Sequence, residues 1–283
     1  MAQDPSKSGK PVRAGEPNLA LLLTWLVPGA GHMYLGRPLI AVIGFVLIEG
    51  LYGLGVLLSD GMFLEYLPLE MRSRFAGALT PEIGNLGALI YQLKTYGYGL
   101  VAAGGQPLPR AWPATMDIGT TLTAVSGILN IFLMSRAHLD ARQPVRPAGR
   151  GPGPTVAAFA SWIVPGGGQI LQGRVSRGVA FFVLLVSLLA LGTWLAEGSN
   201  LDRERHFYYW SGQFMIGLPA IVAEYVHGHS PITGDIQYAD AGVVIASVAG
   251  LLNVLGMLDA YSHSEDRLLA PDEPEEREMG VTA

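Results

Sequence analysis

The stretch TWLVPGAGHMYLGR at residues 24–37 decides the fold, because the chain repeats it 137 residues later. There, residues 161–174 read SWIVPGGGQILQGR, and seven of the fourteen positions are identical. A second echo pairs residues 117–134 with residues 240–257, where Asp, Gly, Val, Gly, Leu, Asn and Met recur at the same spacing. The sequence therefore predicts an internal repeat made by tandem duplication.

The composition is typical of a protein embedded in a membrane. Half of the 283 residues are apolar, only 14% are charged and the mean hydropathy is +0.35, which is too apolar for an ordinary soluble domain. We expect an all-α polytopic integral membrane protein, built from two parallel four-helix repeats with about eight transmembrane segments. Eight apolar runs are long enough to cross the hydrocarbon core, at 18–36, 39–58, 83–103, 116–135, 155–173, 178–196, 207–226 and 239–258.

The repeats divide the chain into five regions. A linker rich in Pro, Gly and Arg separates the halves and should be flexible, and the C-terminal tail is acidic with few apolar residues, so we expect disorder there. The predicted regions are an N-terminal tail at 1–17, membrane repeat 1 at 18–141, the linker at 142–153, membrane repeat 2 at 154–261 and the acidic tail at 262–283.

The distribution of Lys and Arg predicts the topology. If all eight segments cross, 13 basic residues share the side of the termini and four lie opposite. If the first segment of each repeat instead dips in and returns, the balance is nine against eight. The positive-inside rule favours eight crossings, with both termini cytoplasmic in a multi-pass protein of the cell inner membrane.

A helix break is expected at the repeated Pro-Gly-x-Gly element, about 15 Å into the first helix and halfway across the bilayer. Proline removes a backbone donor and glycine permits positive φ. The commoner role of such a break is close helix packing, and the alternative is a half-helix ligand site of the kind found in transporters. The residues concerned are Pro28, Gly29, Gly31 and His32 in the first copy, and Pro165, Gly166, Gly168 and Gln169 in the second. Because Gln169 cannot titrate, we expect His32 to be a packing residue.

Residues 20–45 resemble a family of small membrane domains, whose unit is two transmembrane helices joined around a Gly-x-Gly-His…Tyr-Leu-Gly motif. The first copy matches closely, and the second departs at Gln169 and Gln172. With the later Asn-containing helix, the pattern also resembles an uncharacterised bacterial membrane-protein family. The resemblance implies an integral membrane protein and no particular substrate or catalytic residue.

Polar residues inside the predicted spans are the remaining candidates. Asn130 and Asn253 continue stripes of small residues, which favours an interhelical hydrogen bond over a ligand site. Glu49 is an intramembrane carboxylate, and Lys94 is its expected partner in a buried ion pair. Glu49 has no acidic counterpart in the second repeat, where Val186 stands, and Glu224 is similarly unmatched. For these charged residues, a functional role and a structural ion pair are equally weighted alternatives.

Several kinds of chemistry are not indicated. The chain has no cysteine, which excludes disulfides and thiolate catalysis. His227, His229 and Asp235 have weak metal-ligand spacing and read better as a solvated loop. We expect no enzyme activity, no cofactor, no metal and no nucleic-acid partner.

The leading functional hypothesis is a membrane scaffold or accessory subunit that packs against lipid and other membrane proteins, because the duplicated positions are packing residues. The alternative is a small-solute or ion transporter that uses the Pro-Gly breaks, with Glu49 as the coupling group. Repeat 1 is 14 residues longer than repeat 2 between its motifs, and the mixed aromatic and charged segment at 61–80 is the expected place of the excess. Such a segment would lie on the membrane face or dock a partner.

Overall fold

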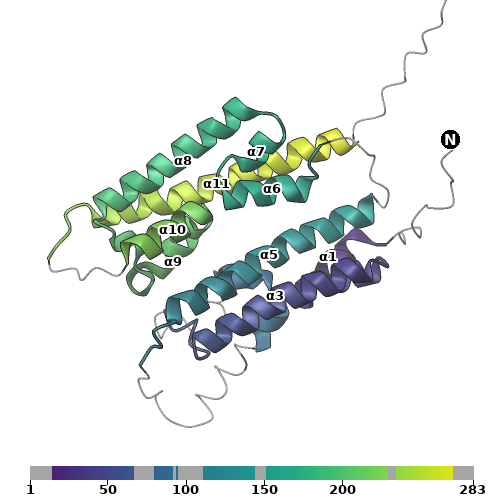
Figure 1. Cartoon of the computed structure of the whole chain (residues 1–283), viewed down its shortest axis with the longest axis horizontal. Coiled ribbons are helices and arrows are strands. Elements are labelled where there is room, and N and C mark those ends of the chain that lie inside the picture. Colours follow the sequence, from purple (N-terminus) through teal and green to yellow (C-terminus); the bar gives the residue numbers. More distant parts are fainter. Residues whose placement is uncertain are drawn as a thin grey trace, which may run out of the picture.

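A computed structural model describes residues 15–66, 80–91, 94, 111–143, 151–228 and 234–269. These residues are helical over most of their length and contain no strand, which confirms the all-α fold class (Figure 1). The first half contains α1 (Pro17–Leu26), α2 (Ala30–Tyr34), α3 (Pro38–Leu58), the 3₁₀ helix η4 (Pro81–Gly84) and α5 (Met116–Arg142). The second contains α6 (Pro154–Ile163), α7 (Gly167–Leu171), α8 (Val175–Leu195), η5 (Ser199–Leu201), α9 (Arg203–Phe214), α10 (Leu218–His227) and α11 (Ala239–Leu269).

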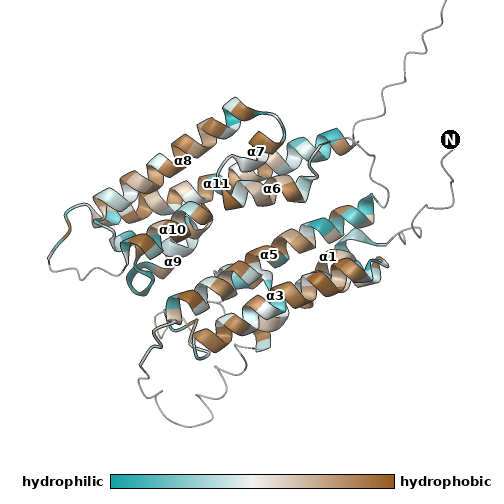
Figure 2. Ribbon diagram, in the orientation of Figure 1, coloured by the Kyte–Doolittle hydropathy of each residue, from teal (hydrophilic) through white to brown (hydrophobic). Residues whose placement is uncertain are grey.

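Four helices are long and apolar enough to cross a membrane. They are α3, α5, α8 and α11, with 21, 27, 21 and 31 residues, and a helix of 21 residues is about 31 Å long. In Figure 2 they are brown along much of their length, and the C-terminal ends of α5 and α11 are teal. The expectation of about eight spans is therefore supported for four of the eight segments.

The first segment of each half is a hairpin and not a single crossing. Helix α1 has only ten residues, or about 15 Å, and it ends before the Pro-Gly element. Gly29 then takes φ of 82°, and a Cβ on it would lie 2.3 Å from the carbonyl oxygen of Ala41. Helix α2 returns to where α1 began, because Glu16 N donates to Tyr34 Oη at 3.2 Å. The same break recurs in the second half, where Gly166 has φ of 78°.

The third apolar segment of the second half is likewise divided. It forms α9 with 12 residues and α10 with ten, each shorter than about 20 Å. Gly217 separates them with φ of 79°, and a Cβ there would lie 1.7 Å from the carbonyl oxygen of Trp162. The corresponding segment of the first half, 83–103, falls partly outside the described residues. Within it, residues 86–91 are helical.

Helices α5 and α11 are the central helices of their halves. In their most apolar windows 56% and 44% of the residues are buried, against 22% in both α3 and α8. The halves meet through an aromatic cluster in which Phe132 of α5 packs edge-on against Phe159 of α6 at 5.3 Å and near Trp162 at 6.2 Å. Figure 1 shows the start of α1 and the ends of α5 and α11 at one end of the molecule.

Candidate functional site

The two asparagines tie the broken helices to the central ones. Asn130 Nδ2 donates to the carbonyl oxygens of Thr24, at 2.9 Å, and Gly84, at 2.8 Å. Both acceptors lie where a helix ends or is interrupted, so a carbonyl group is free to accept. The asparagine thus replaces the helical hydrogen bonds that the break removes.

Asn253 does the same in the second half. Its Nδ2 donates to Ser161 O at 3.0 Å and to Met215 O at 2.8 Å. Ser161 matches Thr24 in the repeated motif, so the Met215 contact identifies Met215 as the counterpart of Gly84. This gives a register for the segment between the motifs, in which Glu82 matches Gln213 and Asn85 matches Ile216. The glycine contacts agree, since a Cβ on Gly127 would meet Pro81 and Glu82 and one on Gly250 would meet Gly212 and Gln213.

At the Pro-Gly breaks, the fully buried His32 and Gln169 face acidic residues of the central helices. His32 Nε2 lies 3.8 Å from Asp140 Oδ2, and Gln169 Nε2 donates to Asp259 Oδ2 at 3.1 Å. The last arginine of each motif pairs with the same carboxylate, Arg37 with Asp140 at 2.5 Å and Arg174 with Asp259 at 3.1 Å. The motif therefore fastens each hairpin to the C-terminal half of its central helix.

Sequence comparison missed these two aspartates because they are 119 residues apart, whereas the surrounding helices repeat at 123. The difference of four residues is about one helical turn, which leaves both carboxylates on the same helix face. The sequence therefore shows the two aspartates on the same face of equivalent helices, but not at the same position when the halves are aligned.

Glu224 belongs to a buried polar network that joins the halves. Arg203 at the start of α9 donates Nε to Glu224 Oε1 and Nη2 to Thr121 Oγ1, the latter at 2.6 Å. Its guanidinium lies 4.1 Å from the ring centroid of Trp210, whose Nε1 donates to Glu224 Oε2 at 3.0 Å. Glu224 is thus an ion-paired structural residue. Sequence reasoning missed Arg203 because it assigned 197–206 to a loop.

Glu49 and Lys94 form no ion pair within the described part of the chain, so the structure does not support the expected pairing. Lys94 is exposed, and Glu49 lies half-buried near the middle of α3. The carboxylate of Glu49 faces the side-chain amide of Asn85 instead. The physical reason is that residues 87–91, not residue 94, lie beside this part of α3.

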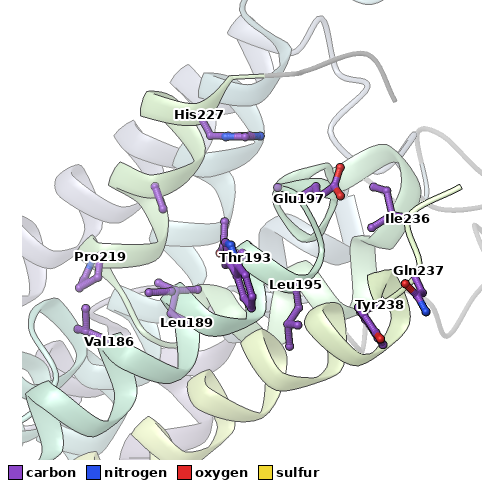
Figure 3. A pocket seen from close by; sticks show the side chains of 14 residues that line it. Val186, Leu189, Thr193, Leu195, Glu197, Pro219, His227, Ile236, Gln237 and Tyr238 are labelled. Atoms are coloured by element: carbon purple, nitrogen blue, oxygen red, sulfur yellow. The ribbon is translucent and has the colours of Figure 1, made fainter. Parts of the chain in front are cut away.

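Glu49 lines a cavity of ≈ 500 Å³ between α3, the end of α1 and residues 87–91. The second half has a cavity of ≈ 880 Å³ between α8 and α10 (Figure 3), where Val186 lines the wall in place of Glu49. Trp194 and Leu189 also line this second cavity. The two cavities lie against equivalent helices, but only the first has an acidic residue in the middle of its spanning helix.

Two further polar residues lie behind Glu49, and the sequence did not single them out. Glu82 is 1% exposed and Asn85 is 0% exposed. Glu82 Oε1 accepts a hydrogen bond from Thr123 Oγ1 at 2.7 Å. In the second half Gln213 takes the place of Glu82, and its Oε1 accepts from Asn200 Nδ2 at 3.0 Å. The acidic group is thus specific to the first half.

The His227, His229 and Asp235 motif lies only partly in the portion of the chain that the structure covers. No group of three or more His, Asp or Glu side chains there is arranged to hold a metal ion. His229 of the weak loop motif lies outside the described residues.

The chain belongs to a family of unknown function, DUF6677, whose match covers residues 19–147 and 156–270. The two matched segments are consistent with a duplicated unit. No curated protein and no solved structure matches the chain.

Proposed function

We propose that this member of the family moves a small ion or ion-coupled solute across the membrane, with Glu49 as the coupling group. The observation that carries the proposal is an acidic side chain near the middle of a spanning helix, facing a cavity of ≈ 500 Å³, without a basic partner among the described residues. Intramembrane carboxylates of this kind mark ion or proton pathways. The Glu49–Lys94 pair that would give Glu49 a purely structural role is not formed.

The arrangement of the hairpins supports the same proposal. Each half places the non-helical backbone of a Pro-Gly break beside a spanning helix, and such backbone at membrane depth is tolerated only inside protein or against a wet cavity. Transporters build their sites from interrupted helices of this type. The two halves would be parallel repeats, since both begin with a hairpin at the same end of the molecule.

Four crossings also give a topology for a multi-pass protein of the cell inner membrane. With α3, α5, α8 and α11 as the spans, connectivity places both termini and the linker on one side, with twelve of the 18 Lys and Arg residues. The positive-inside rule then makes this side cytoplasmic. Because the chain has no cysteine, single-cysteine labelling tests it directly. Arg146→Cys should resist an impermeant maleimide in intact cells, and Glu197→Cys should react.

Transport is tested by reconstituting the purified chain in liposomes that contain a pH-sensitive dye, with H⁺, Na⁺ or K⁺ gradients imposed in turn. At least one gradient should collapse faster than in protein-free liposomes, and Glu49→Gln should slow the collapse by about 100-fold or more, as loss of a proton-transfer group does. Val186→Gln places the same amide in the second cavity and should leave the rate unchanged. Rates equal to those of empty liposomes for all three ions would contradict the proposal.

A scaffold function is the second candidate, and one observation favours it. The duplicated asparagines and the Arg203–Glu224 network all serve packing inside the chain. A scaffold predicts a stable partner that co-purifies in mild detergent and is retained in Glu49→Gln. A chain that purifies alone and still dissipates a gradient would rule this candidate out.

A further inference from the structure

We propose that the cavity of the second half binds one phospholipid that has an ammonium headgroup. An acyl chain of this lipid lies between α8 and α10, and the headgroup meets Glu197 and His227. The headgroup end of the cavity is at the end of α8, which is the outer side in the topology proposed above. The inference goes beyond the proposed transport function, because it concerns a different cavity and does not need Glu49.

The cavity of ≈ 880 Å³ lies between one face of α8 and one face of α10. On α10 this face consists of Pro219, Ala223 and His227, which are spaced four residues apart and therefore share one side of the helix. The residues opposite, on α8, include Ala190 and Thr193. Helix α8 packs along α11, whereas α10 packs on α9 and η5. The two faces are therefore held apart, and these small side chains leave a groove between them.

The cavity extends along one half of a membrane-spanning helix. Its lining on α8 begins at Val186, near the middle of this helix of 21 residues, and continues to Leu195 at the helix end. A helical stretch of this length measures about 15 Å. The hydrocarbon of one leaflet has the same depth, since the whole hydrocarbon core is about 30 Å thick. The length of the cavity therefore matches an acyl chain of a single leaflet.

The polarity of the cavity wall changes from one end to the other. Val186 and Pro219 line the deep end, and Glu197 and Gln237 lie toward the opposite end (Figure 3). Trp194, which also lines the cavity near the end of α8, is 74% exposed. Exposed tryptophan near the end of a span is typical of the level where hydrocarbon meets headgroups. A phospholipid has the same order of apolar and polar parts as this wall, whereas a water-soluble solute does not.

The polar end of the cavity brings a carboxylate close to an imidazole. His227 packs against Gly198, the residue after Glu197, since a Cβ on this glycine would lie 1.9 Å from His227 Nε2. The N–H groups of His227 and Gln237 are donors for phosphate oxygens, and the carboxylate of Glu197 accepts hydrogen bonds from an ammonium group. A headgroup without an ammonium group would place its phosphate near Glu197 with no positive charge between them. The polar end therefore favours an ammonium headgroup over a purely anionic one.

The first half provides a matched comparison. At the repeat spacing of 137 residues, Glu49 and Tyr52 stand where the second cavity has Val186 and Leu189. The first cavity is smaller, at ≈ 500 Å³, and a carboxylate lines its wall in the middle of the spanning helix. Burying a carboxylate against hydrocarbon is costly. The site for an acyl chain therefore belongs to the second half.

The experiment is native mass spectrometry of the purified full chain in detergent, with palmitoyl-oleoyl-phosphatidylethanolamine or palmitoyl-oleoyl-phosphatidylglycerol added. The wild type should retain one ethanolamine lipid and bind it about tenfold more tightly than the glycerol lipid, as one hydrogen bond to a charged group provides. Glu197→Gln should remove this preference. Glu204→Gln, which changes an exposed carboxylate in the first turn of α9, should keep it.

The acyl-chain part of the site is tested by filling the groove. Ala190→Leu should weaken binding of the ethanolamine lipid by about tenfold, because the larger side chain occupies the place of the acyl chain. Ala180→Leu is the matched control. Both alanines are exposed residues of α8, but Ala190 lines the cavity and Ala180 does not. The control should bind the ethanolamine lipid like the wild type.

A second measurement needs no variant. An ethanolamine lipid with a diazirine at the end of its acyl chain should, on illumination, label the wild-type chain around Val186 and Pro219, at the deep end of the cavity. Equal affinity for the two lipids, labelling spread evenly over α3 and α8, or a second copy of the chain bound in place of lipid would overturn the inference. Lipid binding at the cavity without flux in liposomes would contradict transport and leave the lipid site standing. Flux by a chain that binds neither lipid would do the reverse.

Discussion

Glu49 in α3 and Val186 in α8 occupy equivalent places beside two cavities, and behind them Glu82 of the first half stands where Gln213 stands in the second. The backbone contacts around these positions are the same in both halves, including the asparagine bonds and the glycine approaches. One difference is that the first half has carboxylates at two positions where the second half has uncharged side chains. It teaches that the shared contacts belong to the fold common to both halves, and that the carboxylates of the first half are not part of that common fold.

The largest expected effect tests the buried Arg203–Glu224 ion pair of the second half, whose arginine also bonds Thr121 of the first half. Arg203→Met leaves Glu224 buried without its counter-charge and should lower the free energy of unfolding by about 3 to 5 kcal/mol. At the repeat spacing of 137 residues, the counterpart of Arg203 in the first half is Tyr66, whose hydroxyl donates to Asp117 Oδ1. Tyr66→Phe should lower the free energy of unfolding by only about 1 kcal/mol. Denaturant unfolding followed by tryptophan fluorescence measures both.

A double variant serves as the control for this prediction. Arg203→Met with Glu224→Gln removes the uncompensated charge and should recover part of the lost stability. If Arg203→Met alone unfolds like the wild type, neither the ion pair nor the bonds of Arg203 to the first half contribute to stability.

Smaller effects, equal in the two halves, are expected from substituting the glycines that the halves share. A Cβ on Gly127 would lie 2.1 Å from Pro81 O, and one on Gly250 would lie 1.9 Å from Gly212 O. Gly127→Ala and Gly250→Ala should each lower the free energy of unfolding by about 1 to 3 kcal/mol, because the helices must move apart. Gly50→Ala has no atom within 4 Å of the new Cβ and should not lower the free energy of unfolding, because alanine is the better helix former. Unequal losses at the first two positions would break the equivalence of the halves.

The smallest effect concerns Glu49 and Lys94. Lys94 is exposed, so Lys94→Met should change the free energy of unfolding by less than about 0.5 kcal/mol. In a double-mutant cycle with Glu49→Gln the two changes should add, because residues that do not meet are independent. A coupling energy above about 1 kcal/mol would restore the ion pair and return Glu49 to a structural role.

The sequence by itself determined the class of protein and the places where its helices break. Apolar composition sets the partition into a membrane, and the Pro-Gly pair ends a helix wherever it occurs, because proline lacks a donor and glycine takes positive φ. Asn130 and Asn253 were also visible, since a polar amide repeated within apolar segments must find a partner. These are local properties, which each residue carries in any fold.

The tertiary structure decided which groups meet, because the repeat does not keep one register. The offset between halves is 137 at the break motif and at the positive-φ residues Asp60 and Glu197, but 131 at Glu82 and 123 at Asp117. Part of the excess in the first half therefore falls within the segment predicted at 61–80 and the rest follows it. Because the offset changes along the chain, aligning the halves at one fixed offset does not pair equivalent residues such as Glu82 and Gln213.

Which apolar runs form one unbroken helix was decided in the same way. The apolar run at 18–36 is long enough to span, but a reversal at its middle brings its end back beside its start, as the contact between Glu16 and Tyr34 shows. The Arg203–Glu224 pair likewise joins residues that hydropathy assigned to a loop and a span. Charge in a membrane is tolerated where folding brings a counter-charge to it, and that meeting depends on packing between helices that are distant along the chain.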